Sequence, residues 1–174
     1  MPGQDERVYH GATLSSFTSI AMEPLPLVSF ALRIPSRMAS TLNALQSDSA
    51  PDAADMVINI LSAQQASIAT SFSRPDLHPH PFDTTPYFLS ADGLPVIRGS
   101  LGAISCKLVA QGIPLHDLGF LQQRQLDAPG DVPTGASELF IAQVTRVESA
   151  AEENLLPLLY HRRLFTSCTE PPPP

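Results

Sequence analysis

Apolar and polar residues alternate most regularly between residues 27 and 34. One face of this segment carries Val28, Phe30, Leu32 and Ile34, and the opposite face carries Ser29, Ala31 and Arg33. Alternation with a period of two is typical of a β-strand that buries one face. Pro35 ends the strand, because proline has no N–H to donate to a sheet. We therefore expect a half-buried strand whose polar face is turned toward a site or toward solvent.

Helical spacing replaces this alternation directly after the strand. Met38, Leu42 and Leu45 lie on one stripe of a helix predicted over residues 37–46. Ser36 precedes this helix and is a suitable N-cap, because its hydroxyl can accept a hydrogen bond from the first turn.

A second strand and a second helix follow in the same order. Residues 55–61 alternate as a strand, and Ser62-Ala63-Gln64-Gln65 has the form of a capping box. The helix that this box opens is expected to run to about Phe72.

The second half of the chain predicts strands rather than helices. The segment 74–93 is rich in proline, histidine and aspartate and is predicted to be a long loop. Strand-like runs cover 95–98, 101–111 and 138–148, with weaker ones near 114–121 and 156–167 and a polar insertion at 122–136. These runs lie close together without regular helices between them. The series predicts a mainly β domain, a β-barrel with two short helices, rather than a βαβ sheet.

The length of the chain fits a single domain of 174 residues. We place this domain at residues 9–167, after a short polar segment at 1–8. A Pro-rich tail at 168–174 is expected to be disordered, because it cannot contribute to a core.

Charge and cysteine content exclude several classes of function. The net charge is −7 and the only lysine is Lys107, so the chain has no basic stripe for nucleic acid. No apolar run is long enough for a membrane span. Cys106 and Cys168 are isolated, as is typical of a reducing compartment. The cytoplasm is therefore expected, and a mitochondrial location stays open if the true N-terminus is missing.

Two neighbouring segments carry the groups that a phosphorylated, polar-edged ligand needs. The stretch from His10 to Ser19 holds five hydroxyls and one glycine in ten residues. The turn at 33–37 leads into a helix N-terminus, whose free N–H groups suit a phosphate. Both segments together point to a flavin nucleotide. Taken alone, the stretch from His10 to Ser19 also fits a surface turn. The turn at 33–37, taken alone, also fits a capped helix with a solvated arginine.

Other motifs carry weaker signals. His78-Pro79-His80 offers two metal ligands, fewer than a site needs, and fits an exposed loop better. No phosphate-binding glycine loop and no spacing for a hydrolytic triad occurs. Cys106 lies in an apolar strand and is expected in the core. His161 fits either a position near the ligand or an ordinary surface histidine.

In order along the chain, these segments resemble the flavin reductase-like family, the FMN-binding split β-barrels. The family's G-x-T-x-SSFTS motif and following strand resemble HGATLSSFTSIAMEPLPLVSFALR. Its phosphate turn and helix resemble IPSRMASTLNALQ, and its next strand and helix resemble DMVINILSAQQASIATSF. Its later strands and tail resemble LPVIRGSLGAISCKLV, ELFIAQVTRVE and PLLYHRRLF. The resemblance spans about residues 9–166, and Pro-Ser-Arg in the turn is typical of fungal-type members.

The resemblance implies a homodimer with FMN, or alternatively FAD, near the subunit interface. It implies an NAD(P)H-dependent oxidoreductase in which a hydride passes to flavin N5, with a flavin-dependent oxygenase as an expected partner. No catalytic side chain and no metal ligand is then required, because the chemistry belongs to the cofactor. The isoalloxazine would be lined by Thr13, Leu14, Ser15 and Ser16, and the phosphate side held by Arg33, Ser36, Arg37 and Ser40. His161 completes the candidate cofactor-binding residues.

Two departures from the family pattern bear on activity. The apolar first strand of the family is absent, because the chain before Tyr9 is short and polar. Many members carry Gly-Asp-His where this chain has Gly135-Ala136-Ser137, so a histidine that could seat the nicotinamide is missing. Two alternatives to a flavin reductase therefore stand: an FMN-binding module with little or no reductase activity, and a flavin-free β-barrel interaction protein.

Overall fold

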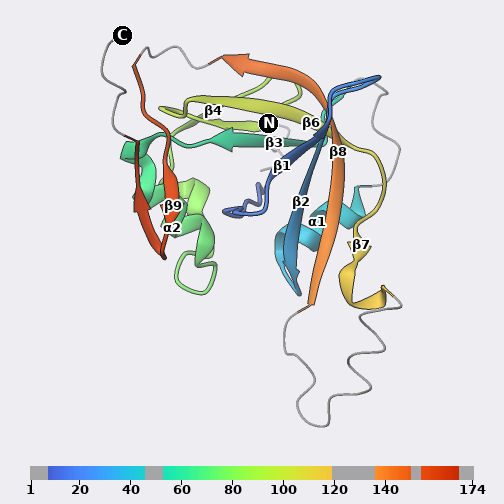
Figure 1. Cartoon of the computed structure of the whole chain (residues 1–174). Helices are drawn as coiled ribbons and strands as arrows, with labels where there is room; N and C mark the ends of the chain where they lie inside the picture. The colour runs from blue at the N-terminus through green and yellow to red at the C-terminus, as the bar shows by residue number, and fades with distance from the viewer. Residues whose placement is uncertain (1–7, 46–52, 119–135, 150–153, 169–174) are drawn as a thin grey trace, which may run out of the picture.

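The computed structural model describes residues 8–45, 53–118, 136–149 and 154–168 (Figure 1). Its strands are β1 (Thr18–Ala21), β2 (Leu27–Ile34), β3 (Met56–Ile60), β4 (Tyr87–Leu89), β5 (Pro95–Ile97), β6 (Gly102–Leu108), β7 (Ile113–Pro114), β8 (Ala136–Ser149), β9 (Leu159–His161) and β10 (Leu164–Thr166). Its α-helices are α1 (Arg37–Ala44) and α2 (Ala66–Ser73), and its 3-10 turns are η1 (Ala63–Gln65), η2 (Pro81–Asp83) and η3 (Leu115–Asp117). The predicted fold class, mainly β with two short helices, is confirmed.

Strand β8 is the central strand of the main sheet. The order of this sheet is β1-β2-β8-β6-β3, with β7 also paired to β8, and the pairs are antiparallel. The first part of β8, Ala136–Gln143, pairs with β2, and its second part, Ala142–Ser149, pairs with β6. In Figure 1, β8 runs beside β2 and then curves over to meet β6. The sheet order has two ends, β1 and β3, as in a split rather than a closed barrel.

Two smaller sheets flank the main one. Strand β4 pairs with β5, and β9 pairs with β10 as a hairpin. The chain leading into this hairpin lies against the start of η1, where the Ala63 amide donates to the Leu156 carbonyl at 2.8 Å. The Leu158 amide donates to the Leu61 carbonyl at 3.0 Å. The hairpin and α2 therefore form a block apart from α1 (Figure 1).

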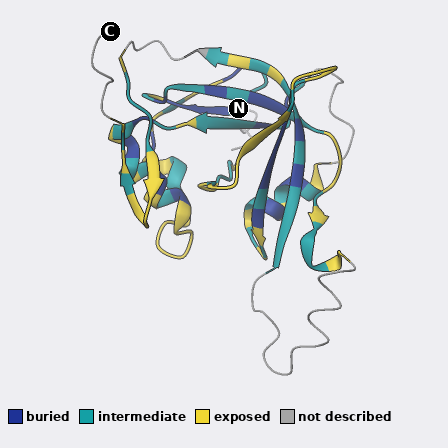
Figure 2. Ribbon diagram, viewed as in Figure 1, coloured by how far each residue is buried: buried dark blue, intermediate teal, exposed yellow. Residues whose placement is uncertain are grey.

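The buried core lies where β2, β8 and α1 meet (Figure 2). Val28, Phe30 and Leu32 are buried, as the alternation in this segment predicts. Ser29, which was expected on an open polar face, is buried as well, because β1 pairs with β2 at this position. Phe30 faces Phe140 directly across the β2–β8 pair, and their rings stack with centroids 5.5 Å apart. Leu42 of α1 closes the core from one side at 2% exposure. Burying one such side chain stabilises the fold by about 1.5–3 kcal/mol, so this layer fixes α1 against the sheet.

The predicted elements of the first half are confirmed close to their expected bounds. Strand β2 covers the predicted 27–34. The first helix begins as predicted with Ser36 as N-cap but ends at Ala44 rather than 46. The capping box is present, with the Gln65 side chain accepting a hydrogen bond from the Ser62 amide at 2.9 Å.

Two predictions in the second half were wrong in part. The segment 74–93 is not loop throughout, because it contains η2 and β4. Three residues next to Pro86 are too few to show alternation, and their partner strand β5 lies beyond the loop. In the run 114–121, Pro114 lies in β7 but residues 115–117 form η3. Residues 119–121 lie outside the described residues.

Three predicted segments fall wholly or mostly outside the described ranges: the polar N-terminal segment 1–8 apart from Val8, the insertion 122–136 apart from Ala136, and the tail after Cys168. Within the described ranges, no helix combines the length and the hydropathy needed to cross a membrane.

Candidate functional site

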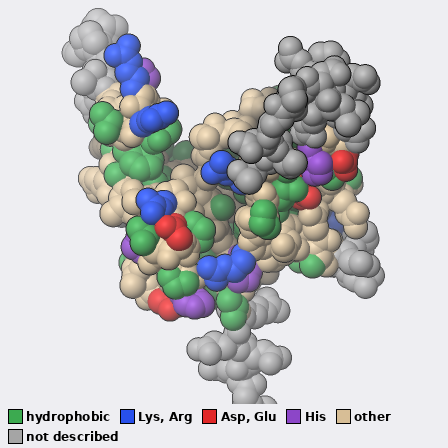
Figure 3. All heavy atoms as spheres, turned by 90° about the horizontal axis from the view of Figure 1, so that it is seen from below, with side chains coloured by type: hydrophobic (Ala, Val, Ile, Leu, Met, Phe, Trp, Pro, Cys, Tyr) green, Lys and Arg blue, Asp and Glu red, His purple; other side chains and the backbone are tan. Residues whose placement is uncertain are grey.

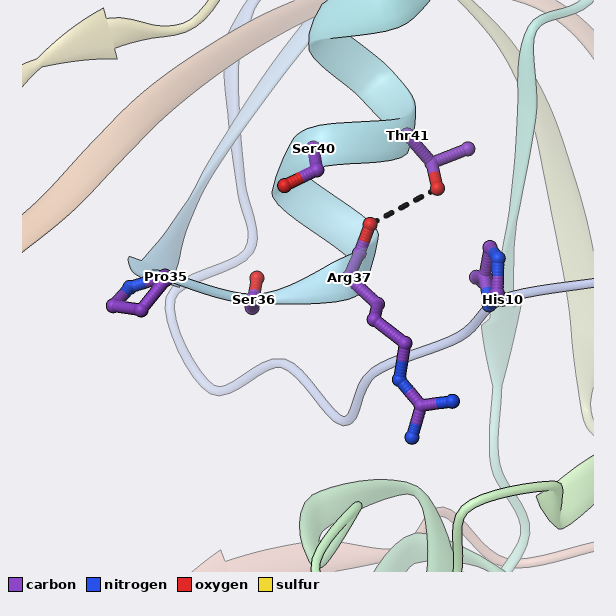
Figure 4. A pocket seen from close by; sticks show the side chains of 6 residues that line it. All are labelled: His10, Pro35, Ser36, Arg37, Ser40 and Thr41. Carbon is purple, nitrogen blue, oxygen red and sulfur yellow. Dashed lines mark hydrogen bonds between the residues drawn. The ribbon is translucent and has the colours of Figure 1, made fainter.

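A hollow of about 490 Å³ opens at the start of α1 (Figure 4). Ser36, Arg37, Ser40 and Thr41 line one side of it with Pro35, and His10 lines the other. Figure 3 shows the molecule from below, where Lys, Arg and His side chains are scattered among apolar and other polar groups. No carboxylate is among the residues that line the hollow.

The first turn of α1 is a capped helix N-terminus with hydroxyls beside it. The Ser36 side chain accepts a hydrogen bond from the Ala39 amide at 3.2 Å and so caps the helix. The first amides of a helix have no partner inside it, and they carry a partial positive charge. The Ser40 hydroxyl is exposed one turn on, and the Thr41 hydroxyl donates to the Arg37 carbonyl at 2.9 Å. Three hydroxyl-bearing residues and one guanidinium therefore line the hollow beside the first turn of α1.

The Ser/Thr-rich segment is held against the same strand that leads into this turn. Ser16 donates its hydroxyl to the Ala31 carbonyl at 3.2 Å and accepts from the Ala31 amide at 2.8 Å. Arg33 lies two residues further along β2 and is exposed. The two segments that the sequence singled out are therefore neighbours in space.

The remaining residues of the segment have different surroundings. Thr13 donates its hydroxyl to the Ala69 carbonyl at 2.6 Å and its amide to the Phe72 carbonyl at 3.3 Å. Leu14 packs against the core, and Ser15 is exposed. Thr13 thus fastens the segment to α2, and Ser15 presents a hydroxyl to the surface.

Of the predicted site residues, Ser36, Arg37 and Ser40 line the hollow, whereas Thr13, Leu14, Ser15, Ser16, Arg33 and His161 do not. Arg33 stands opposite Ser137 in the β2–β8 register. This places Ser137, the position where many family members carry histidine, at the strand end that leads into the turn before α1. His161 is exposed at the end of β9, next to Arg162 and Arg163, and does not line the hollow.

Three residues that line the hollow are not among the predicted cofactor-binding residues: His10, Pro35 and Thr41. His10 and Pro35 do lie in the two segments that the sequence pointed to. Thr41 could have been found, because it lies one helical turn after Arg37 and so shares its face. His10 directly precedes the glycine of the Ser/Thr motif, but nothing local shows that its side chain reaches α1.

The described residues form no group of three or more side chains suited to a metal ion. His78 and His80, the two histidines of the long connection, are exposed.

Known proteins match this chain in both sequence and fold. The model of the flavin reductase like domain family matches residues 3–169. The FMN reductase (NADH) SmoA of Agrobacterium fabrum (strain C58 / ATCC 33970) is 31% identical over 109 residues, which are 63% of this chain and 53% of that protein. The chain therefore matches about half the length of this relative.

Solved structures share the fold. The styrene monooxygenase flavin reductase SMOB from Pseudomonas putida S12 superposes with a TM-score of 0.63 at 24% identity, covering 93% of this chain and 83% of that one. Nitrilotriacetate monooxygenase component B from Mycobacterium thermoresistibile gives a TM-score of 0.65 at 23% identity, covering 92% and 72%. Because the family model matches nearly the whole of this chain, the chain belongs to the flavin reductase like domain family.

Proposed function

We propose that this protein binds FMN and reduces it with NAD(P)H. The observation that carries the proposal is the hollow at the start of α1, which gathers phosphate-binding groups in a chain of the flavin reductase like domain family. The name of the relative from Agrobacterium fabrum, FMN reductase (NADH), supports the same flavin and the same class of reductant.

The donor set fits a terminal phosphate monoester. The Arg37 guanidinium extends from α1 beside the hollow, with the hydroxyls of Ser36 and Ser40 on the same turn (Figure 4). Charge-assisted hydrogen bonds from such groups are about twice as strong as neutral ones. We assign the phosphate of FMN to this turn, with Arg33 at the end of β2 as a further cation.

The flavin ring would lie along the Ser/Thr segment. Thr13, Leu14, Ser15 and Ser16 are the candidates for its polar edge and its apolar face. The hydrogen bonds of Thr13 to α2 and of Ser16 to β2 hold this wall in place before any ligand arrives. The bound flavin supplies the hydride acceptor, and the residues of the chain bind and orient it.

A direct test is the visible spectrum of the purified protein with added FMN, followed by anaerobic addition of NADH or NADPH. We expect flavin uptake and then bleaching of the flavin band. Failure to take up FMN would contradict the proposal.

The double variant Ser36→Ala, Arg37→Ala should weaken FMN binding by at least tenfold, since it removes a charge-assisted contact worth about 1.5–3 kcal/mol. The matched control is Ser73→Ala, Arg74→Ala, a serine–arginine pair at the end of α2 whose arginine pairs with Asp76. Circular dichroism checks that both variants fold. Equal FMN affinity in both would place the phosphate elsewhere.

A second candidate function is FMN binding with little or no reductase activity. The observation that favours it is Ser137, which occupies the histidine position of many family members and stands opposite Arg33. Uptake of FMN without bleaching by either nicotinamide cofactor would support this alternative.

The proposal extends to partners. SMOB and nitrilotriacetate monooxygenase component B are named as reductase or component of monooxygenase systems. We propose that this protein likewise supplies reduced flavin to an oxygenase, and that it does so as a homodimer.

A further inference from the structure

The side chain of His10 faces the first turn of α1 across the hollow, although the two segments are more than twenty residues apart in the sequence (Figure 4). Arg37 extends from the helix on the side that faces His10. Both residues line the hollow, and neither makes an ion pair within the described part of the chain.

Tyr9, the residue before His10, is fixed by an aromatic cluster. Its ring lies edge-on to Phe82 at 6.0 Å and to Tyr87 at 5.9 Å, measured between centroids. Its hydroxyl donates to the Gly93 carbonyl at 3.0 Å. Edge-to-face ring pairs stabilise beyond the area they bury, so Tyr9 is held firmly.

Gly11, the residue after His10, is fixed by close packing. A Cβ atom at this position would lie 2.7 Å from the Phe72 ring, which real side chains do not tolerate. Phe72 in turn packs edge-on against Phe82 with centroids 4.8 Å apart. The chain is therefore pinned on both sides of His10, and the imidazole is presented to the hollow by a rigid backbone.

The chemistry of the hollow selects an anion. Its polar lining is made of one imidazole, one guanidinium and three hydroxyls, with no carboxylate, in a chain with 17 acidic residues and a net charge of −7. An imidazole presents an N–H donor whether neutral or protonated. A donor opposite Arg37 can contact the oxygens of a phosphate that the helix turn does not reach.

We infer that His10 is a specificity-determining residue that binds the terminal phosphate of the flavin from the side opposite α1, and so makes the protein prefer FMN over riboflavin. This inference rests on the proposed function. The inference adds to the proposed function a phosphate-binding residue that lies outside the turn before α1, and it predicts which flavin the protein prefers.

The test compares FMN and riboflavin, which share the ring and the ribityl chain and differ in the phosphate. The dissociation constants are measured by titration for the wild-type chain, His10→Leu, His10→Lys and the control His78→Leu, whose histidine is exposed in the long connection. His10→Leu should raise the FMN dissociation constant about tenfold and leave the riboflavin constant nearly unchanged. His10→Lys should restore the preference for FMN, and His78→Leu should not change it.

If His10→Leu does not fold, His10→Ala is measured with the same expectation. Equal weakening of both flavins would make His10 a merely structural residue and overturn the inference, as would an unchanged FMN affinity. Equal wild-type affinity for the two flavins would also overturn it. A wild-type chain that binds neither flavin would refute the proposed function itself.

Discussion

The hydroxyls of the Ser/Thr segment divide into two kinds by their partners. Those of Thr13 and Ser16 already donate to backbone carbonyls, at Ala69 and Ala31. The Ser15 hydroxyl is exposed and has no side-chain hydrogen bond within the described residues. Thr13 and Ser16 therefore fix the shape of the segment, while Ser15 is the hydroxyl best placed to contact a ligand directly.

The two cysteines differ in reactivity because of burial. Cys106 is completely buried in β6, and burial raises the pKa of its thiol from 9.0 to about 12, whereas Cys168 is exposed. The thiolate is the reactive form. At a pH of about 8, iodoacetamide should modify Cys168 in the folded protein and reach Cys106 only after unfolding. Mass spectrometry of labelled peptides checks this, and fast labelling of Cys106 without denaturant would contradict it.

The same shift makes stability depend on pH in a definite direction. A thiol whose pKa is raised by folding stays protonated in the folded chain where the unfolded chain already loses its proton. The stabilising contribution of Cys106 is therefore complete below about pH 9 and is lost as the pH rises toward 12.

Helix α1 is held to the sheet by a polar contact at the end away from the hollow. The Asn43 side chain donates to Glu138 of β8 at 2.7 Å and accepts from the Gly112 amide at 3.0 Å. Both bonds are partly buried. Asn43 thus joins α1, β8 and the turn before β7, and it complements the buried Leu42 beside it.

Replacing Asn43 by alanine should lower the free energy of unfolding by about 1–3 kcal/mol, because it leaves a carboxylate and an amide without their partner. Urea denaturation measures the change. Gln111→Ala, which removes an exposed amide side chain from the neighbouring turn, is the control and should have little effect. If Asn43→Ala lowers the free energy of unfolding no more than Gln111→Ala does, water fully replaces the hydrogen bonds of Asn43.

At the scale of elements, the sequence predicted what is encoded locally and missed what depends on distant partners. Strand β2 and the Ser36 cap follow from alternation and from a single hydroxyl, and both were predicted. Strand β4 was missed, because three residues show no period and its pairing partner lies beyond a loop. His10 was missed for the same physical reason: its place beside α1 depends on the packing of Tyr9 and Gly11 against rings from α2 and the following connection.

At the scale of the molecule, the sheet leaves an apolar edge uncovered. Strand β1 is one end of the sheet order and pairs with β2 within the described chain. Large apolar side chains on this strand and directly before and after it are exposed by 36% to 72%: Phe17, Ile20, Met22 and Leu25. An exposed apolar edge strand is a template for association, and proteins normally cover one.

We propose that the chain forms a homodimer in which a second copy covers this edge. Ile20→Glu should then shift the protein from dimer to monomer, because it places a charge in the centre of the covered surface. Light scattering coupled to size-exclusion chromatography measures the mass. Leu77→Glu is the matched control, since Leu77 is 63% exposed in the connection after α2. A wild-type monomer, or a dimer that survives Ile20→Glu, would show that β1 is not the interface.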